Sequence, residues 1–340
     1  MGDIKEKDKK EEITVSVLVA VYNGEKYLEQ CLSSLLAQTL QNVQIICVDD
    51  CSTDSSLGIL HKYQQIDDRV EVIHLEKNQG QGHARNVALS QAKGKYICFL
   101  DSDDTLSADA LQSAVAVFEN HEKTDSVLFH VVYCNSEGEP TGDYPMNSFE
   151  VMPGREAFEN SLTWKIHGIY IVRASIHQQY PYDETCRTYS DDNTTRIHFY
   201  QSREVRCCDG IYYYRQHPAS VTHCVSVSRF DYLKANESMK HQLVSLGVDK
   251  DVLNLYENVR WLVVIDLYMF YFKNRDKLSG ADRNYGINEI KRVWKGIELS
   301  RLNRRYLFKF GYIPFRPFWT LFRIQEELYF VLRKLIKKTV

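Results

Sequence analysis

The chain has 340 residues, of which 44% are hydrophobic and 26% charged, so it can fold as one large domain or as a domain with an extension. Its formal net charge of -3 gives no overall basic character and excludes a general nucleic-acid-binding protein. The most apolar stretch, residues 261–272, is too short to cross a bilayer, and the charged start carries no secretory signal, so we expect a cytoplasmic protein.

Residues 1–12 are charged and are expected to form a disordered tail. Four apolar runs rich in β-branched residues follow, and each of them predicts a strand. These strands are expected at residues 15–21, 43–48, 70–75 and 95–100. Apolar repeats with helical spacing separate them, at residues 27–36, 54–65 and 84–92. The alternation predicts a parallel sheet with helices on both faces, which is an α/β fold.

The pattern changes in the second half of the chain. Glycine and proline cluster between residues 138 and 153, and a short strand signal follows at residues 210–214. Beyond Ser228 the spacing becomes helical and the chain is rich in tyrosine and lysine. We therefore expect a main domain over residues 13–225 and a helical extension over residues 226–340.

Acidic residues stand where two of the predicted strands end. Asp50 follows the second strand, and Asp101, Asp103 and Asp104 follow the fourth. The carboxyl ends of parallel strands meet at one edge of a sheet, so these side chains are expected to share a crevice. Crowded carboxylates repel one another unless a cation joins them, and a hard divalent cation carrying phosphate oxygens is suited to this. Each aspartate alone could be a helix cap, but together they predict a nucleotide site.

Four motifs, in this order and spacing, resemble those of the family 2 glycosyltransferases. They are Val17–Asn23, Val48–Asp54, Ala84–Asn86 and Phe99–Asp104. The resemblance covers roughly residues 13–220, and Cys51 stands where the family more often has glycine. It implies the GT-A fold, which is Rossmann-like with a mostly parallel central sheet and flanking helices, and an inverting transfer from a nucleotide sugar.

The resemblance also implies roles for single residues. The DxD motif would bind Mn²⁺ or Mg²⁺ through Asp103. The residues implied to bind the nucleotide sugar are Ala20, Tyr22, Asp50, Arg85, Asp101 and Ser102. The structural alternative for Arg85 is a surface arginine.

Asp192 would be the catalytic base by the same resemblance, with Asp191 in place of the glutamate usual before it. Such a base removes the proton from the acceptor hydroxyl group as that group attacks. The structural alternative is a helix N-cap. His217, after the last predicted strand, would be the second protein ligand of the metal, although a lone histidine is more often structural.

The C-terminal segment combines basic and aromatic side chains, interrupted by Pro314 and Pro317. This combination is typical of helices that lie on a membrane surface, and the alternative is packing against the main domain. The expected function is metal-dependent transfer of a hexose, most commonly from a UDP sugar, to a glycan or lipid-linked acceptor. Bacterial surface polysaccharide synthesis at the cytoplasmic face of the membrane is the implied setting.

Two other function classes fit part of the sequence. Asp101, Asp103 and Thr105 match the DxDxT signature of haloacid-dehalogenase-type phosphatases. That signature normally follows the first strand of its fold, whereas three predicted strands precede it here. A non-catalytic sugar-nucleotide-binding protein is the other alternative, and the presence of both Asp103 and Asp192 argues against it.

Overall fold

The computed structural model describes residues 12–186, 189, 191–217 and 225–338. The described chain divides into two compact units. The first contains the chain up to Tyr182 together with Thr194–His217, and the second contains Asp183–Asn193 and the described residues from 225 onward. Apart from Glu12, the predicted N-terminal tail lies outside the described residues.

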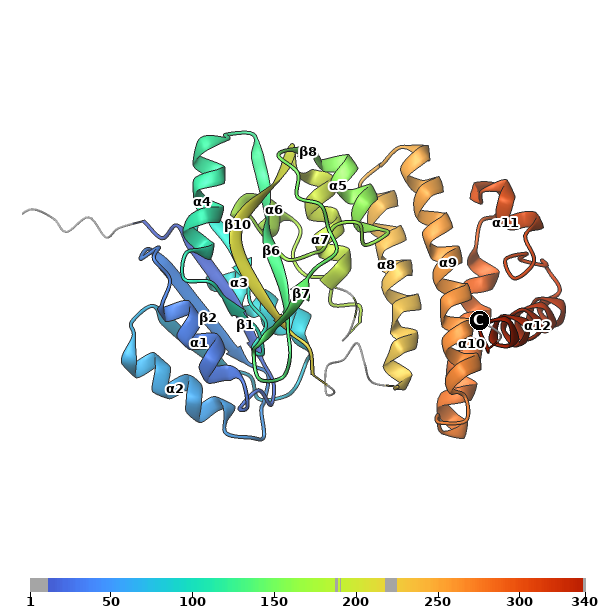
Figure 1. Ribbon diagram of the computed structural model, residues 1–340, viewed down its shortest axis with the longest axis horizontal. Helices are drawn as coiled ribbons and strands as arrows, with labels where there is room; N and C mark the ends of the chain where they lie inside the picture. The colour runs from blue at the N-terminus through green and yellow to red at the C-terminus, as the bar shows by residue number, and fades with distance from the viewer. Residues whose placement is uncertain (1–11, 187–188, 190, 218–224, 339–340) are drawn as a thin grey trace, which may run out of the picture. The chain divides into compact units, whose positions relative to one another are not determined.

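The first unit is built on a mixed sheet with flanking helices (Figure 1). Its strands are β1 (Val15–Val21), β2 (Val43–Asp49), β3 (Val70–His74), β4 (Tyr96–Phe99), β5 (Thr105–Leu106), β6 (Thr124–Cys134), β7 (Pro140–Asp143), β8 (Met152–Pro153), β9 (Tyr170–Arg173) and β10 (Glu204–Arg215). Their spatial order is β3-β2-β1-β4-β9-β6-β10-β5, with β7 paired to β6 and β8 paired to β10. Strands β1 to β4 are parallel, β9 is antiparallel to both of its neighbours, and β10 is parallel to β6. The predicted fold class is confirmed.

Helices cover both faces of this sheet. They are α1 (Leu28–Leu36), α2 (Ser56–Ile66), α3 (Gln81–Gln91), α4 (Ala110–Asn120), α5 (Gly154–Ser161) and α6 (Ala174–Gln179). Helix α7 (Asp191–Gln201) begins in the second unit and continues in the first. Successive side chains of a strand point to opposite faces. Val17 and Val19 of β1 share a core with α1 and α4, whereas Ser16 accepts a hydrogen bond at 2.8 Å from the backbone of Gly94, just beyond α3.

The second unit is helical, as the sequence predicted for the C-terminal region. Its helices are the 3-10 turn Val227–Phe230, α8 (Asp231–Ser245), α9 (Lys250–Asn274), α10 (Gly280–Gly296), the 3-10 turn Leu299–Arg301, α11 (Arg304–Phe308) and α12 (Trp319–Lys338). Trp261, Trp294 and Phe322 are buried in its core. None of the helices in the described ranges is long and apolar enough to span a bilayer.

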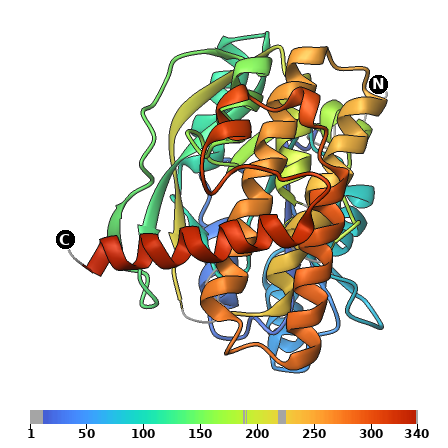
Figure 2. The same ribbon diagram turned by 90° about the vertical axis from the view of Figure 1, so that its right-hand side faces the viewer.

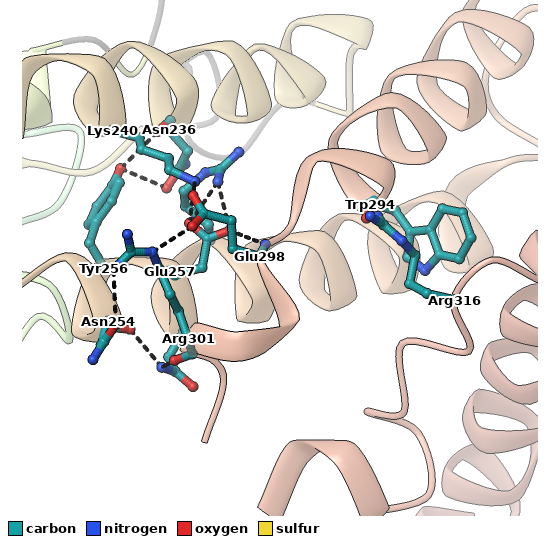
Figure 3. Close-up of polar contacts among 11 residues, drawn as sticks. Asn236, Lys240, Asn254, Tyr256, Glu257, Trp294, Glu298, Arg301 and Arg316 are labelled. Atoms are coloured by element: carbon teal, nitrogen blue, oxygen red, sulfur yellow. Dashed lines mark hydrogen bonds and ion pairs between the residues drawn. The ribbon is translucent and has the colours of Figure 1, made fainter. Parts of the chain in front are cut away.

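A buried ion-pair network joins α8, α9 and the chain after α10 (Figure 3). The Glu257 carboxylate is fully buried and lies 2.9 Å from Lys240 Nζ and 2.8 Å from the Arg260 guanidinium. It also accepts a hydrogen bond from the Glu298 backbone N–H at 2.8 Å. The Glu298 side chain in turn pairs with Lys240 and with Arg301. A buried carboxylate is costly without such partners, so these contacts fix the packing of the helices.

Candidate active site

Apart from Arg85 and His217, the predicted site residues of the first unit lie where β1, β2 and β4 end. These strands are parallel neighbours, so the loops that follow them open on one edge of the sheet. Ala20 is near the end of β1, and Tyr22 follows this strand with 52% of its surface exposed. Ser102 lies in the loop after β4, where its Oγ is 3.2 Å from the position that a Cβ on Gly24 would take.

Asp50 holds the glycine-bearing loop that precedes α3. The side chain is buried, and its two oxygens accept hydrogen bonds from the backbone N–H groups of Gln79 and Gly80, both at 2.7 Å. The Asn78 side chain also donates to the Asp50 carbonyl oxygen at 3.2 Å. Asp50 therefore sets the conformation of this loop, and its contact with a nucleoside stays a prediction.

Two tight turns at this edge have left-handed backbone conformations. The φ angles are 51° at Asn23 and 62° at Cys51. The Asn23 side chain accepts a hydrogen bond from the backbone N–H of Thr53 at 2.8 Å, which ties the two turns together. A positive φ favours glycine over residues with a Cβ, and this explains why glycine is common at the position of Cys51.

Arg85 is a buried partner of Asp101, so the structural alternative of a surface arginine is wrong. Its side chain is 1% exposed and pairs with the Asp101 carboxylate. The guanidinium lies over the rings of Phe99 and Tyr182, with its central carbon 4.5 Å and 5.3 Å from the ring centroids. Gln81 donates a further hydrogen bond to Asp101 at 2.9 Å. Arg85 thereby fixes the position of a carboxylate that was predicted to bind the nucleotide sugar.

Asp103 and His217, the two predicted metal ligands, lie side by side. Nε2 of His217 is 2.9 Å from Oδ2 of Asp103, although 114 positions separate them in the chain. The His217 ring also contacts Tyr27, with 5.2 Å between the ring centroids. Within the described ranges, no set of three or more His, Cys, Asp or Glu side chains is placed to share a metal ion. Of the two side chains present, the carboxylate is a donor that suits Mg²⁺ and Mn²⁺, and the imidazole is a common ligand of transition-metal ions.

Three buried residues hold the acidic loop in place, and their contacts with one another were not predicted from the sequence. The Asp104 carboxylate is buried and accepts hydrogen bonds from the Tyr212 hydroxyl and the Arg215 backbone N–H, both at 2.7 Å. The Tyr212 hydroxyl also accepts from the Asp101 backbone N–H at 3.3 Å. Burial, with a smaller contribution from the charges of Asp103 and Asp101, raises the pKa of Asp104 well above its usual value.

The Arg215 side chain extends this support to neighbouring loops. Its guanidinium donates to the Asp103 carbonyl oxygen at 2.8 Å, to the Ser136 carbonyl oxygen at 2.9 Å and to Gln30 Oε1 at 2.6 Å. It also lies over the ring of Tyr27, 4.6 Å from the centroid. The sequence predicted a short strand at residues 210–214, directly before Arg215, but none of these contacts with the loops.

Asp192, the predicted base, belongs to the second unit and lies in the first turn of α7. Its Oδ2 accepts a hydrogen bond from the Tyr232 hydroxyl at 2.8 Å. The next residue, Asn193, donates to the Ala235 carbonyl oxygen at 2.8 Å, so the start of α7 is attached to α8. The position also suits a helix cap, because carboxylates in a first turn are stabilised by free backbone N–H groups. Its role as the base stays a prediction.

Residues 16–180 match the family model described as glycosyl transferase family 2. Among curated relatives, the chain is 46% identical over 98 residues to the putative teichuronic acid biosynthesis glycosyltransferase TuaG of Bacillus subtilis. This aligned stretch covers 29% of this chain and 39% of TuaG. It is 28% identical over 232 residues to the glycosyltransferase GlyG of Streptococcus pneumoniae, covering 61% of this chain and 72% of GlyG. The chain thus spans well under half the length of TuaG but most of GlyG.

The fold as a whole resembles a solved structure. A crystal structure of residues 1–349 of TarS from S. aureus matches 93% of this chain and 91% of that one, with a TM-score of 0.69 and 21% sequence identity. At this identity the likeness speaks for the fold alone, and it agrees with the GT-A architecture expected from the motifs. The segment of residues 16–180 is thus identified as a glycosyl transferase family 2 domain.

Proposed function

We propose that the protein is an inverting, metal-dependent glycosyltransferase that moves a hexose from a UDP sugar to a hydroxyl group of a glycan or lipid-linked acceptor. The observation that carries this proposal is the contact between Asp103 and His217 at 2.9 Å, beside the end of β4. Family membership favours transfer of a sugar over the phosphatase chemistry that the DxDxT pattern alone would allow.

A UDP sugar as donor is supported by the fold neighbour. TarS is named a poly(ribitol-phosphate) beta-N-acetylglucosaminyltransferase, and its structures include complexes with UDP and with UDP-GlcNAc. In this chain, the half-exposed ring of Tyr22 is available to stack on a base. Asp50 and Asp101 are the carboxylates proposed to bind the nucleoside, and Arg85 orients Asp101.

Asp103 and His217 would hold the metal ion, Mn²⁺ or Mg²⁺. Two protein ligands leave coordination positions for phosphate oxygens and water. When bound, such an ion supplies positive charge that stabilises the leaving diphosphate. Asp192 would accept the proton of the acceptor hydroxyl group. A base on the side opposite the diphosphate gives a single displacement with inversion at the anomeric carbon.

We also propose a setting for this reaction, which is bacterial surface polysaccharide synthesis at the cytoplasmic face of the membrane. Two names support it, because TuaG is named for teichuronic acid biosynthesis and TarS is named a poly(ribitol-phosphate) beta-N-acetylglucosaminyltransferase. A lipid-linked acceptor would require the protein to work next to the bilayer, in peripheral contact with it.

The test separates catalysis from binding. Asp192→Asn should lower transfer from UDP sugars by at least about 100-fold, as expected for loss of a general base, while UDP affinity stays within a few-fold. Asp231→Asn, which removes a carboxylate from the first turn of another helix, is the matched control and should keep activity. Asp103→Ala should abolish the metal dependence of UDP binding in calorimetry. Full transfer by Asp192→Asn, or an unchanged metal titration of Asp103→Ala, would contradict the corresponding assignment.

A further inference from the structure

Helix α12 has apolar side chains on two opposite faces. The inner face packs into its own unit through residues that include Phe322, Glu326 and Phe330, all buried. The outer face carries seven apolar residues that are each between 44% and 66% exposed. These residues, called the outer ridge below, are Leu321, Ile324, Leu328, Val331, Leu332, Leu335 and Ile336. A helix that is apolar on both sides normally has a partner on both sides.

Several contacts hold α12 and the segment before it firmly in place. Gln325 exchanges two hydrogen bonds with the backbone of Ile313, at 3.3 Å and 3.1 Å. The indole N–H of Trp294 donates to the Pro314 carbonyl oxygen at 2.7 Å. Arg316, labelled next to Trp294 in Figure 3, donates to the carbonyl oxygen of Trp294. Figure 2 shows α12 running across the other helices of its unit at the front of the view. The outer ridge is thus a fixed surface feature.

The outer ridge is too large to be incidental. From residue 321 to residue 336 it is about 22 Å long, at 1.5 Å per helical residue. Its exposed apolar area is on the order of 600 Å², which is the upper end for the largest apolar patch of a typical monomer. Phe318 (61% exposed), just before α12, and Phe310 (46% exposed), which contacts Tyr329, enlarge the apolar surface further.

The charges around the outer ridge are mainly basic. Arg333 and Lys334 are exposed, and Lys337 and Lys338 follow them in the sequence. The acidic residues of the helix do not offset this charge. Glu326 is buried, and Glu327 already pairs with Arg275 at 2.9 Å. An apolar stripe on a helix whose exposed charged residues are basic matches the interface of an anionic bilayer, where each Lys or Arg adds attraction and the apolar side chains enter the boundary of the acyl chains.

We propose that the outer ridge of α12 docks this protein on an anionic membrane surface, with the helix lying in the plane of the interface. The inference rests on the peripheral setting proposed above and deepens it by naming the surface and the charge of the lipid. The spacing of Leu321, Ile324, Leu328, Val331 and Leu335 would also suit pairing with a second copy. Such pairing would bring basic α12 helices together, whereas anionic lipid is complementary to them.

Vesicle sedimentation tests the proposal without nucleotide, so its result is independent of transfer activity. The full chain is mixed with vesicles of phosphatidylcholine alone or with about one third phosphatidylglycerol, a membrane with a negative surface potential. Binding should occur on the anionic vesicles and weaken with salt. The double variant Leu328→Ser/Leu335→Ser should bind at least about tenfold more weakly, since two large side chains no longer enter the bilayer.

The control is Ile66→Ser/Val244→Ser, which removes two equally exposed aliphatic side chains from α2 and α8. It should bind vesicles like the unchanged protein, and all variants should keep their melting temperature because the residues are exposed. No sedimentation with any vesicle would overturn the proposal together with the peripheral setting. Equal binding by the α12 variant and the control would overturn the assignment to α12. If the unchanged protein does not bind vesicles but forms a dimer in light scattering, and the α12 variant does not form this dimer, the partner of the outer ridge is a second copy instead.

Discussion

The hydroxyl group of Tyr212 is the smallest part of the acidic site whose loss can be measured. It donates to Asp104 at 2.7 Å and accepts from the Asp101 backbone at 3.3 Å, and the residue is fully buried. Tyr212→Phe keeps the ring and its packing and removes only this oxygen. We therefore expect the variant to fold and to lose the link between the two ends of the acidic loop.

The magnitude follows from the two contacts. A buried polar group that loses its partner costs about 1–3 kcal/mol. Asp104 keeps the hydrogen bond from the Arg215 backbone, and the Asp101 contact is long, so the lower half of that range applies to each. A total near 2 kcal/mol would lower the melting temperature of a unit of this size by about 4–8 °C. In calorimetry, metal-dependent UDP binding should also weaken several-fold, because the carboxylate of Asp103 follows the loop.

The matched control is Tyr213→Phe, since the next residue of a strand points to the opposite face of the sheet. It should leave both melting and UDP binding unchanged. If Tyr212→Phe melts like the unchanged protein, or if the two variants lose equal stability, the Tyr212 hydroxyl group does not hold the acidic loop.

Two further predictions concern stability. Burial raises the pKa of Glu326 to about 8, so the folded chain keeps a proton that the unfolded chain releases near pH 4.5, and the free energy of unfolding should fall between these pH values. Glu326→Gln should remove this fall and stabilise the protein at pH 8 by up to a few kcal/mol. Urea unfolding at pH 5, 6.5 and 8 measures this effect. If the variant keeps the pH dependence, Glu326 is not its source. Cys51→Gly should raise the unfolding free energy by up to about 1 kcal/mol, because φ is 62° at this position. The same urea assay measures this change, with Cys207→Gly as the control. A lower unfolding free energy of Cys51→Gly relative to this control would show that the Cys51 side chain matters more than the backbone.

The strands that follow continuous apolar runs could be predicted from the sequence almost to the residue. The predicted run at residues 43–48 became β2 (Val43–Asp49), and the run at residues 95–100 became β4 (Tyr96–Phe99). These strands are central and buried on both faces, so their sequences are apolar throughout. The last strand was harder to predict, because β10 extends from Glu204 to Arg215 and its pairing with β6 shifts register between Cys207 and Ile211. Such an irregularity disrupts the alternation that identifies a strand.

The candidate site, too, could be predicted from the sequence only in part. Asp103 and His217 could be named from motifs, and the structure brings them into contact. The burial of Arg85 could not be predicted, since its position depends on Tyr182, which is far away in the chain. For the same reason, no local pattern could identify Tyr212 and Arg215 as partners of the acidic loop, because a hydrogen bond across more than 100 positions leaves no periodic signal.

Strand β10 has a consequence for how much of the chain is needed to bring the two predicted metal ligands together. The segment that matches the family ends at residue 180, whereas Tyr212, Arg215 and His217 all come later and all contact the acidic loop. A fragment that ends with the matched segment would keep Asp103 but none of the three side chains that brace or complete its surroundings. Asp103 can meet His217 only after β10 has inserted beside β6, so nearly two thirds of the polypeptide must leave the ribosome before the predicted metal ligands come together.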